Sequence, residues 1–145
     1  LKSTVNDDQK LIEIVFTLLD GVLQIFKNKI KAEEELKQAF VFNSRWGKSV
    51  AIESKNEETI KLALKTGFKL TIRKDPEKGF VRIKTLPEKK LDLTPLYQKI
   101  KTIDKKGTWF FHSSKNMLLN SSSKNPNFIP TPLSLPQLIK LIKSL

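Results

Sequence analysis

The chain has no cysteine and a single histidine, His112, among its 145 residues. Disulfide bonds and thiolate metal sites are therefore excluded, and one histidine without cysteines is a poor basis for a self-contained zinc site. No apolar run approaches the roughly 20 residues of a membrane span, and no signal-peptide pattern is seen. We therefore expect a cytoplasmic protein that holds no cofactor in this chain and has no membrane partner.

Arginine is also scarce: three arginines stand against 24 lysines, although the net charge is +12. Residues 1–42 contain six lysines and seven carboxylates, whereas residues 43–145 contain 21 cations and eight carboxylates. The basic excess therefore lies entirely in the second part, where its field would attract polyanions. An A+T-rich genome that encodes lysine at many solvent-exposed positions would give the same excess. The scarcity of arginine favours this explanation, because phosphate sites usually depend on arginine forks. Both interpretations stay open.

The first part of the chain has the apolar spacing of helices. From Leu11 to Phe26, apolar residues recur at intervals of three and four, which predicts an amphipathic helix. A second, short helix is expected from Glu33 to Phe40, with Phe40 buried. Because this part is nearly neutral and the rest is basic, we place a domain boundary near Phe42.

After Phe42 the apolar period changes from that of helices to that of strands. Strands are predicted near residues 49–53, 69–74, 80–86, 108–112 and 117–121, and helices near residues 7–27, 56–66, 94–103 and 135–144. Asn56, Thr94 and the capping box from Ser134 to Gln137 indicate three of the helix starts.

These elements predict an α+β fold, with a largely antiparallel sheet, helices packed on one face of it, and an N-terminal helical segment before it. Residues 1–42 would be that helical segment or an interdomain connector. Residues 43–145 would be a basic α+β binding domain, in which the uncovered face of the sheet is free to bind a partner.

The first predicted hairpin gathers four cations on one face. If Leu70 and Ile72 point to the helices, the alternation of a strand sends Lys69, Arg73, Arg82 and Lys84 to the other face. Like charges placed opposite each other on paired strands are destabilising, and a bound anion would relieve the repulsion. The alternative is a solvated face whose cations extend into water.

The second predicted hairpin joins an aromatic triplet to a polar turn. His112 is followed by Ser113, Ser114, Lys115 and Asn116, and the returning strand ends in Asn120 and Ser121. Hydroxyl, amide and ammonium donors without carboxylates suit a phosphate, so we expect the turn to face one. His112 would be one donor among several rather than a catalyst, because it has no evident orienting carboxylate. The alternative is an ordinary turn.

One segment carries a resemblance to a known family. Gly79-Phe80-Val81-Arg82-Ile83-Lys84, followed by Leu91-Asp92-Leu93-Thr94 at a helix start, resembles the C-terminal substrate-binding (DHHA1-like) domain of DHH-type phosphoesterases. In that family a VRIS-like strand precedes a DV-type helix start, and a GGGH turn binds the substrate phosphate. The similarity covers about Ser49 to Ser123. The GGGH turn does not occur here; His112 occupies a comparable place after the helix.

The resemblance implies that this chain is the accessory substrate-binding part of an enzyme. The Asp-His-His motif of the catalytic half is not in the sequence, so the chemistry would lie upstream and residues 1–42 would be the connector. We find no catalytic motif and name no catalytic residue. Whether the protein acts as an enzyme stays open.

Two functions from different classes are therefore expected. One is a nucleic-acid or nucleotide-phosphate binding domain, whose partner is a nucleic acid or a phosphorylated small molecule. The other is a protein-interaction domain without catalytic activity, whose basic face meets an acidic partner. In either case the N-terminal helices would contact a second copy of the chain or an upstream catalytic domain.

Overall fold

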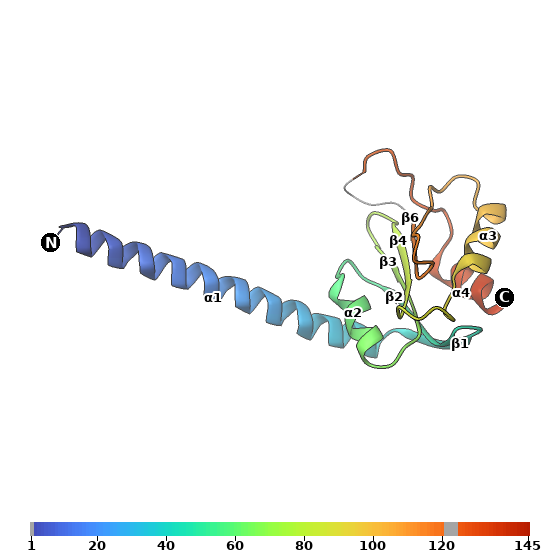
Figure 1. The fold of residues 1–145 in the computed structure, drawn as a ribbon, viewed down its shortest axis with the longest axis horizontal. Coiled ribbons are helices and arrows are strands. Elements are labelled where there is room, and N and C mark those ends of the chain that lie inside the picture. The colour runs from blue at the N-terminus through green and yellow to red at the C-terminus, as the bar shows by residue number, and fades with distance from the viewer. Residues whose placement is uncertain (1, 121–124) are drawn as a thin grey trace.

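The computed structural model describes residues 2–120 and 125–145, as one long helix that leads into a compact mixed domain (Figure 1). The helices are α1 (Lys2–Lys37), α2 (Glu58–Lys65), α3 (Thr94–Ile103) and α4 (Leu135–Lys143). The strands are β1 (Phe40–Ser44), β2 (Gly47–Glu53), β3 (Leu70–Lys74), β4 (Val81–Thr85), β5 (Phe110–Phe111) and β6 (Met117–Asn120).

The six strands form one sheet in the order β1-β2-β3-β4-β6-β5. Only β2 and β3 are parallel, and α2 provides the crossover between them; the other neighbouring strands are antiparallel. The predicted α+β class, with a largely antiparallel sheet after an N-terminal helical segment, is confirmed.

Helices lie on both sides of this sheet. On one side, α3 and α4 cover the main core, which contains the inward side chains of β3, β4 and β6 such as Ile72, Ile83 and Leu118. On the other side, Val50 and Ile52 of β2 pack with Ala63 of α2 and with Leu36 of α1. Figure 1 shows α2 and the end of α1 on the opposite side of the sheet from α3 and α4. The free face expected from the sequence is therefore restricted to β4, β6 and β5, because Thr71 and Arg73 on the same side of β3 are also buried.

The N-terminal part differs from the prediction of two helices. α1 is a single helix that continues to Lys37, because no glycine or proline interrupts residues 27–37. Phe40 then begins β1 and is 53% exposed, so the predicted short helix with a buried Phe40 is wrong. The boundary placed near Phe42 falls inside β1, where Phe42 itself is buried.

The helix starts follow the predicted caps with one change. The Asn56 side chain accepts a hydrogen bond from the Glu58 amide, and the capping box of Ser134 with Gln137 is present. At α3, however, Asp92 rather than Thr94 supplies the acceptor, since its Oδ1 accepts from the Thr94 amide at 2.7 Å. Among the described residues, no helix combines the length and the apolar character needed to cross a bilayer.

Asp104, directly after α3, organises the return of the chain to the sheet. Its Oδ1 accepts from the amides of Lys106 and Gly107, and its Oδ2 accepts from Trp109 Nε1 at 2.8 Å and from the Thr131 hydroxyl. Burial raises the pKa of Asp104, but the hydrogen bonds from Thr131 and the other donors outweigh it, so the pKa lies below its usual value. This carboxylate therefore ties together three segments of the chain.

Candidate nucleic-acid interface

On the side of the sheet opposite α3 and α4, the strands β3, β4, β6 and β5 carry two parallel rows of side chains. The cross-strand register places Arg73, Arg82, Leu119 and Phe110 in one row. The second row contains Thr71, Lys84 and Met117, and it is continued by His112, whose amide donates to the Met117 carbonyl. We call the residues of these two rows the open face.

The two arginines of the open face have different environments. Arg82 is partly exposed, and its Nη1 lies 3.1 Å from Glu57 Oε1. Arg73 is only 8% exposed, because the loop before α2 covers it and the Ser54 carbonyl accepts from its Nη1 at 2.9 Å. Burial and the neighbouring Arg82 guanidinium lower the pKa of Arg73. The expectation that Arg73 faces solvent is therefore wrong.

Lys69 lies in a different environment from Arg82 and Lys84. Its Nζ is 3.2 Å from Glu88 Oε1, and its side chain lines an open cleft of about 500 Å³ together with Arg45, Lys48 and Lys90. Of the four cations expected on one solvent-facing surface, the open face therefore presents only Arg82 and Lys84 to solvent.

The turn after His112 is exposed and is partly held by its own side chains. His112 Nδ1 lies 2.8 Å from the Ser114 hydroxyl and accepts from the Ser114 amide, while Lys115 adopts a left-handed φ of 62°. Lys115 Nζ lies 3.8 Å from Asp92. Ser113 is exposed at the tip. The turn thus keeps Ser113, Lys115 and one edge of His112 at the surface, at the end of the second row.

The two asparagines of this hairpin have structural roles. Asn116 Nδ2 lies within hydrogen-bonding distance of Thr85 Oγ1, the Glu88 carbonyl and the Leu91 carbonyl. Asn120 is fully buried, donates to two carbonyls and accepts from the Thr131 amide. Because these bonds occupy both side chains, we leave Asn116 and Asn120 out of the candidate interface. Ser121 lies outside the described residues.

The sequence reasoning gave too little weight to the apolar part of the open face. As alternation predicts, Trp109 and Phe111 pack against the core, whereas Phe110 points the other way and is 47% exposed. Its ring meets that of His112 edge-on, with 6.3 Å between the ring centroids. Met117 and Leu119, both half-buried, lie between Phe110 and the two cations. The alternation of the strands is the sequence signal that places Phe110, Met117 and Leu119 on the same side of the sheet as Arg82 and Lys84.

The open face therefore places guanidinium and ammonium groups beside an exposed aromatic ring and two aliphatic side chains. Such a surface can bind phosphate and stack a planar ring. The described residues contain no cluster of three or more histidine, aspartate or glutamate side chains that could hold a metal ion.

Comparisons with protein-family models, with curated proteins and with solved structures found no match to this chain. A functional assignment must therefore be argued from the open face itself.

Proposed function

We propose that the sheet domain binds a nucleic acid or a nucleotide through its phosphate and base on the open face. The observation that carries the proposal is the row in which Arg82, Leu119 and Phe110 follow one another across β4, β6 and β5. A cation at one end of the row and an exposed ring at the other match a phosphate and a base of one strand.

Each side chain has a distinct part in this proposal. Arg82 and Lys84 bind phosphate oxygens, and Phe110 stacks on a base. A ligand phosphate replaces the exposed Glu57 carboxylate, which holds Arg82 in the free protein. His112, Ser113 and Lys115 extend the donor set at the end of the second row.

The more specific proposal is that the domain is the accessory substrate-binding part of a DHH-like phosphoesterase. Arg82 and Lys84 both belong to the Val81–Thr85 strand that carries the resemblance, and Asp92 of the same motif accepts a hydrogen bond from the Thr94 amide at the start of α3. Substrate held on the open face would be presented to a catalytic domain elsewhere in the assembly.

The second candidate is a protein-interaction domain that meets an acidic partner. It is favoured by the predominance of lysine and by the ion pair of Arg82 with Glu57, which shows that a protein carboxylate fits this position. The two candidates differ at Phe110, because stacking on a base requires the ring, whereas binding to carboxylates depends mainly on the cations.

The test is fluorescence anisotropy of a labelled single-stranded 12-mer at several salt concentrations. Arg82→Gln with Lys84→Gln should weaken binding by about tenfold or more and reduce the salt slope by roughly one to two. Lys99→Gln with Lys106→Gln removes the same charge from exposed positions elsewhere and should have a much smaller effect.

Phe110→Ala separates the two candidates. It should weaken oligonucleotide binding by about 1–3 kcal/mol while leaving the salt slope unchanged, because a stacked base but no phosphate contact is lost. Equal losses in the Arg82/Lys84 variant and in the Lys99/Lys106 control would contradict the open face as the binding site. An unchanged affinity in Phe110→Ala would favour the protein-interaction candidate.

A further inference from the structure

α1 projects from the sheet domain as a helix of 36 residues, about 54 Å long at 1.5 Å per residue (Figure 1). Only its C-terminal end packs against the domain. Between Leu11 and Ile30 the large apolar side chains of the helix are half-exposed or more. An uncovered apolar surface of this extent is rare on monomeric proteins and indicates an interaction site.

The exposed apolar residues form one continuous stripe along the helix. Leu11, Val15, Leu18, Val22 and Ile25 recur at alternating spacings of four and three, which is the pattern of a coiled-coil seam. Three further apolar residues widen the seam on one side: Ile12, Leu19 and Phe26. The exposed side chains of Ile14, Phe16, Leu23 and Ile30 lie at the margins of this stripe. The opposite side of the helix is polar along its whole length.

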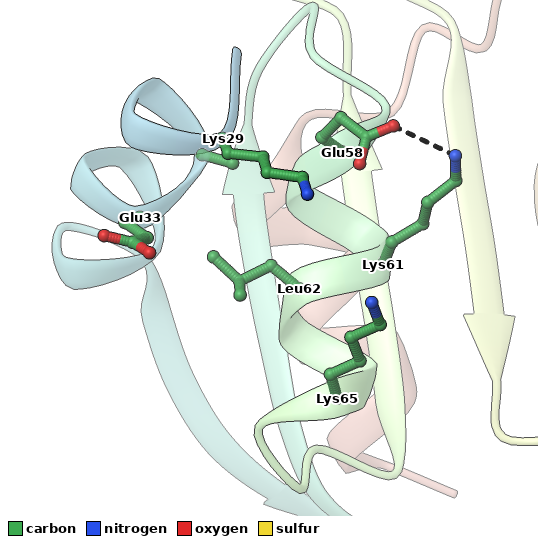
Figure 2. Close-up of a pocket in the computed structure, with 7 residues that line it drawn as sticks. Lys29, Glu33, Glu58, Lys61, Leu62 and Lys65 are labelled. Carbon is green, nitrogen blue, oxygen red and sulfur yellow. Dashed lines mark hydrogen bonds and ion pairs between the residues drawn. The ribbon is translucent and has the colours of Figure 1, made fainter. Parts of the chain in front are cut away.

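α2 already covers the last part of this stripe. Ala32, seven residues after Ile25, is buried, and Leu36 packs against the buried cluster of Val50, Ile52, Ala63 and Phe68. Figure 2 shows Leu62 of α2 directed toward α1, beside a cleft of about 180 Å³ that Lys29 and Glu33 also line. The stripe is therefore covered at the C-terminal end of α1 and uncovered N-terminal to Lys29.

We propose that the uncovered stripe pairs in an antiparallel manner with α1 of a second copy of this chain. The apolar positions of the stripe are arranged symmetrically about a point between Leu18 and Leu19. A two-fold axis there brings apolar residues together in pairs: Leu18 with Leu19, Val15 with Val22, and Leu11 with Phe26. An isologous interface of this kind closes as a dimer.

The charges at the two ends of the stripe select the antiparallel direction. Asp7 and Asp8 precede the stripe, whereas Lys27, Lys29 and Lys31 surround its other end. About the same axis Asp8 meets Lys29 of the second copy. A parallel pair would instead place carboxylates beside carboxylates and lysines beside lysines, which is unfavourable. Lys29 makes no ion pair within the described part of the chain, so it is available.

The area of the stripe suits a stable dimer. Its eight apolar side chains are each between 46% and 64% exposed. Covering them would bury roughly 800 Å² per copy, close to the share of each partner in an interface of standard size. A membrane surface is a poorer match, because Glu13 and Asp20 lie on the polar side and residues 1–42 have no basic excess for anionic lipids.

The first test is sedimentation equilibrium of the 145-residue chain. Wild type should dimerise, and Leu18→Asp should raise the dimer dissociation constant by at least about thirtyfold, because two charges would be buried in the seam. Thr17→Asp adds the same charge on the polar side and should change it less than threefold. A monomeric wild type at 100 μM would overturn the proposal, whatever else covers α1.

The second test exploits the lack of cysteine in the chain. Under mild oxidation, a mixture of Val15→Cys and Val22→Cys chains should form a mixed disulfide dimer, since these positions face each other. Val15→Cys alone should not cross-link, because two copies of residue 15 would lie about 10 Å apart along the axis. Cross-linking of Val15→Cys alone, without mixed dimers, would establish a parallel pair and overturn the antiparallel one.

Discussion

α1 and the sheet domain contain similar apolar residues and expose them very differently. Leu18 in α1 is 64% exposed, whereas Leu118 in β6 is fully buried between β4, β5 and the helices above the sheet. The two regions also differ in charge, because the basic excess begins only after residue 42. The sheet domain therefore has its own core, whereas the apolar face of α1 N-terminal to Lys29 is not covered by any other described part of the chain.

The comparison shows two ways in which apolar sequence is used. In the sheet domain, alternate residues of each strand meet helices that the same chain supplies. In α1, the helical period is equally clear, but only its last turns meet α2. The difference can be tested by making matched changes in the two regions.

The largest effect is expected from matched leucine truncations. Leu118→Ala should lower the free energy of unfolding by about 4 kcal/mol, because it removes buried apolar surface and leaves a cavity. Leu18→Ala should change it by less than about 0.5 kcal/mol at a protein concentration where α1 is unpaired, because the side chain is already in water. Urea unfolding followed by circular dichroism measures both. Similar losses would mean that α1 is part of the cooperative fold.

Matched aspartate truncations should give the next largest effect. Asp104→Ala leaves the Trp109 and Thr131 donors without their acceptor and should cost about 3 kcal/mol of unfolding free energy. Asp20→Ala removes an exposed carboxylate from α1 and should be within about 0.5 kcal/mol of wild type. A stable Asp104→Ala protein would show that the return loop is not fixed by this carboxylate.

The two arginines of the open face should separate folding from binding. Arg73→Gln should cost about 1–2 kcal/mol of unfolding free energy, since the bond to the Ser54 carbonyl is buried. Arg82→Gln should leave stability within about 0.5 kcal/mol, because its ion pair with the exposed Glu57 carboxylate is only partly shielded from solvent. Thermal unfolding and oligonucleotide anisotropy on the same samples distinguish them. A stability loss in Arg82→Gln would remove it from the candidate interface.

The smallest effect concerns acid stability. The pKa of Asp104 is below its usual value in the folded protein, so its contribution to stability is fully present above the pKa of the unfolded chain, near 3.8. That contribution is lost as the pH falls through the folded pKa. Asp104→Asn should therefore lose less stability than wild type between pH 4 and pH 2, although it is less stable at pH 7. Parallel curves over that range would contradict the assignment.

Local patterns were enough to predict most elements of the sheet domain. The helix starts at Asn56 and Ser134 were identified because a cap depends on residues only a few positions apart. β1 was missed because its aromatic residues follow a long helical run without an intervening breaker. Its pairing with β2 depends on the turn at residues 45–46 and on burial of Phe42 rather than on its own composition.

The candidate interface was only partly predictable. Alternation correctly sends Arg82 and Lys84 to the side opposite the main core, and it separates Phe110 from Trp109 and Phe111. Alternation cannot distinguish Arg82 from Arg73, since the two arginines lie on the same side of the sheet and are paired across the hairpin. That distinction depends on the loop before α2. Its Ser54 carbonyl accepts from the buried Arg73, whereas its exposed Glu57 carboxylate pairs with the partly exposed Arg82.

The sequence by itself determined most of the element types, the basic character of residues 43–145 and the apolar stripe of α1, because these depend on composition and on short-range periodicity. Only the tertiary structure decided which side chains reach solvent. It buried Arg73 and Asn120, paired Lys69 with Glu88, and left the apolar stripe of α1 uncovered N-terminal to Lys29. The physical reason is that burial is set by contacts between residues far apart in the chain, and spacing along one element carries no information about what lies against it.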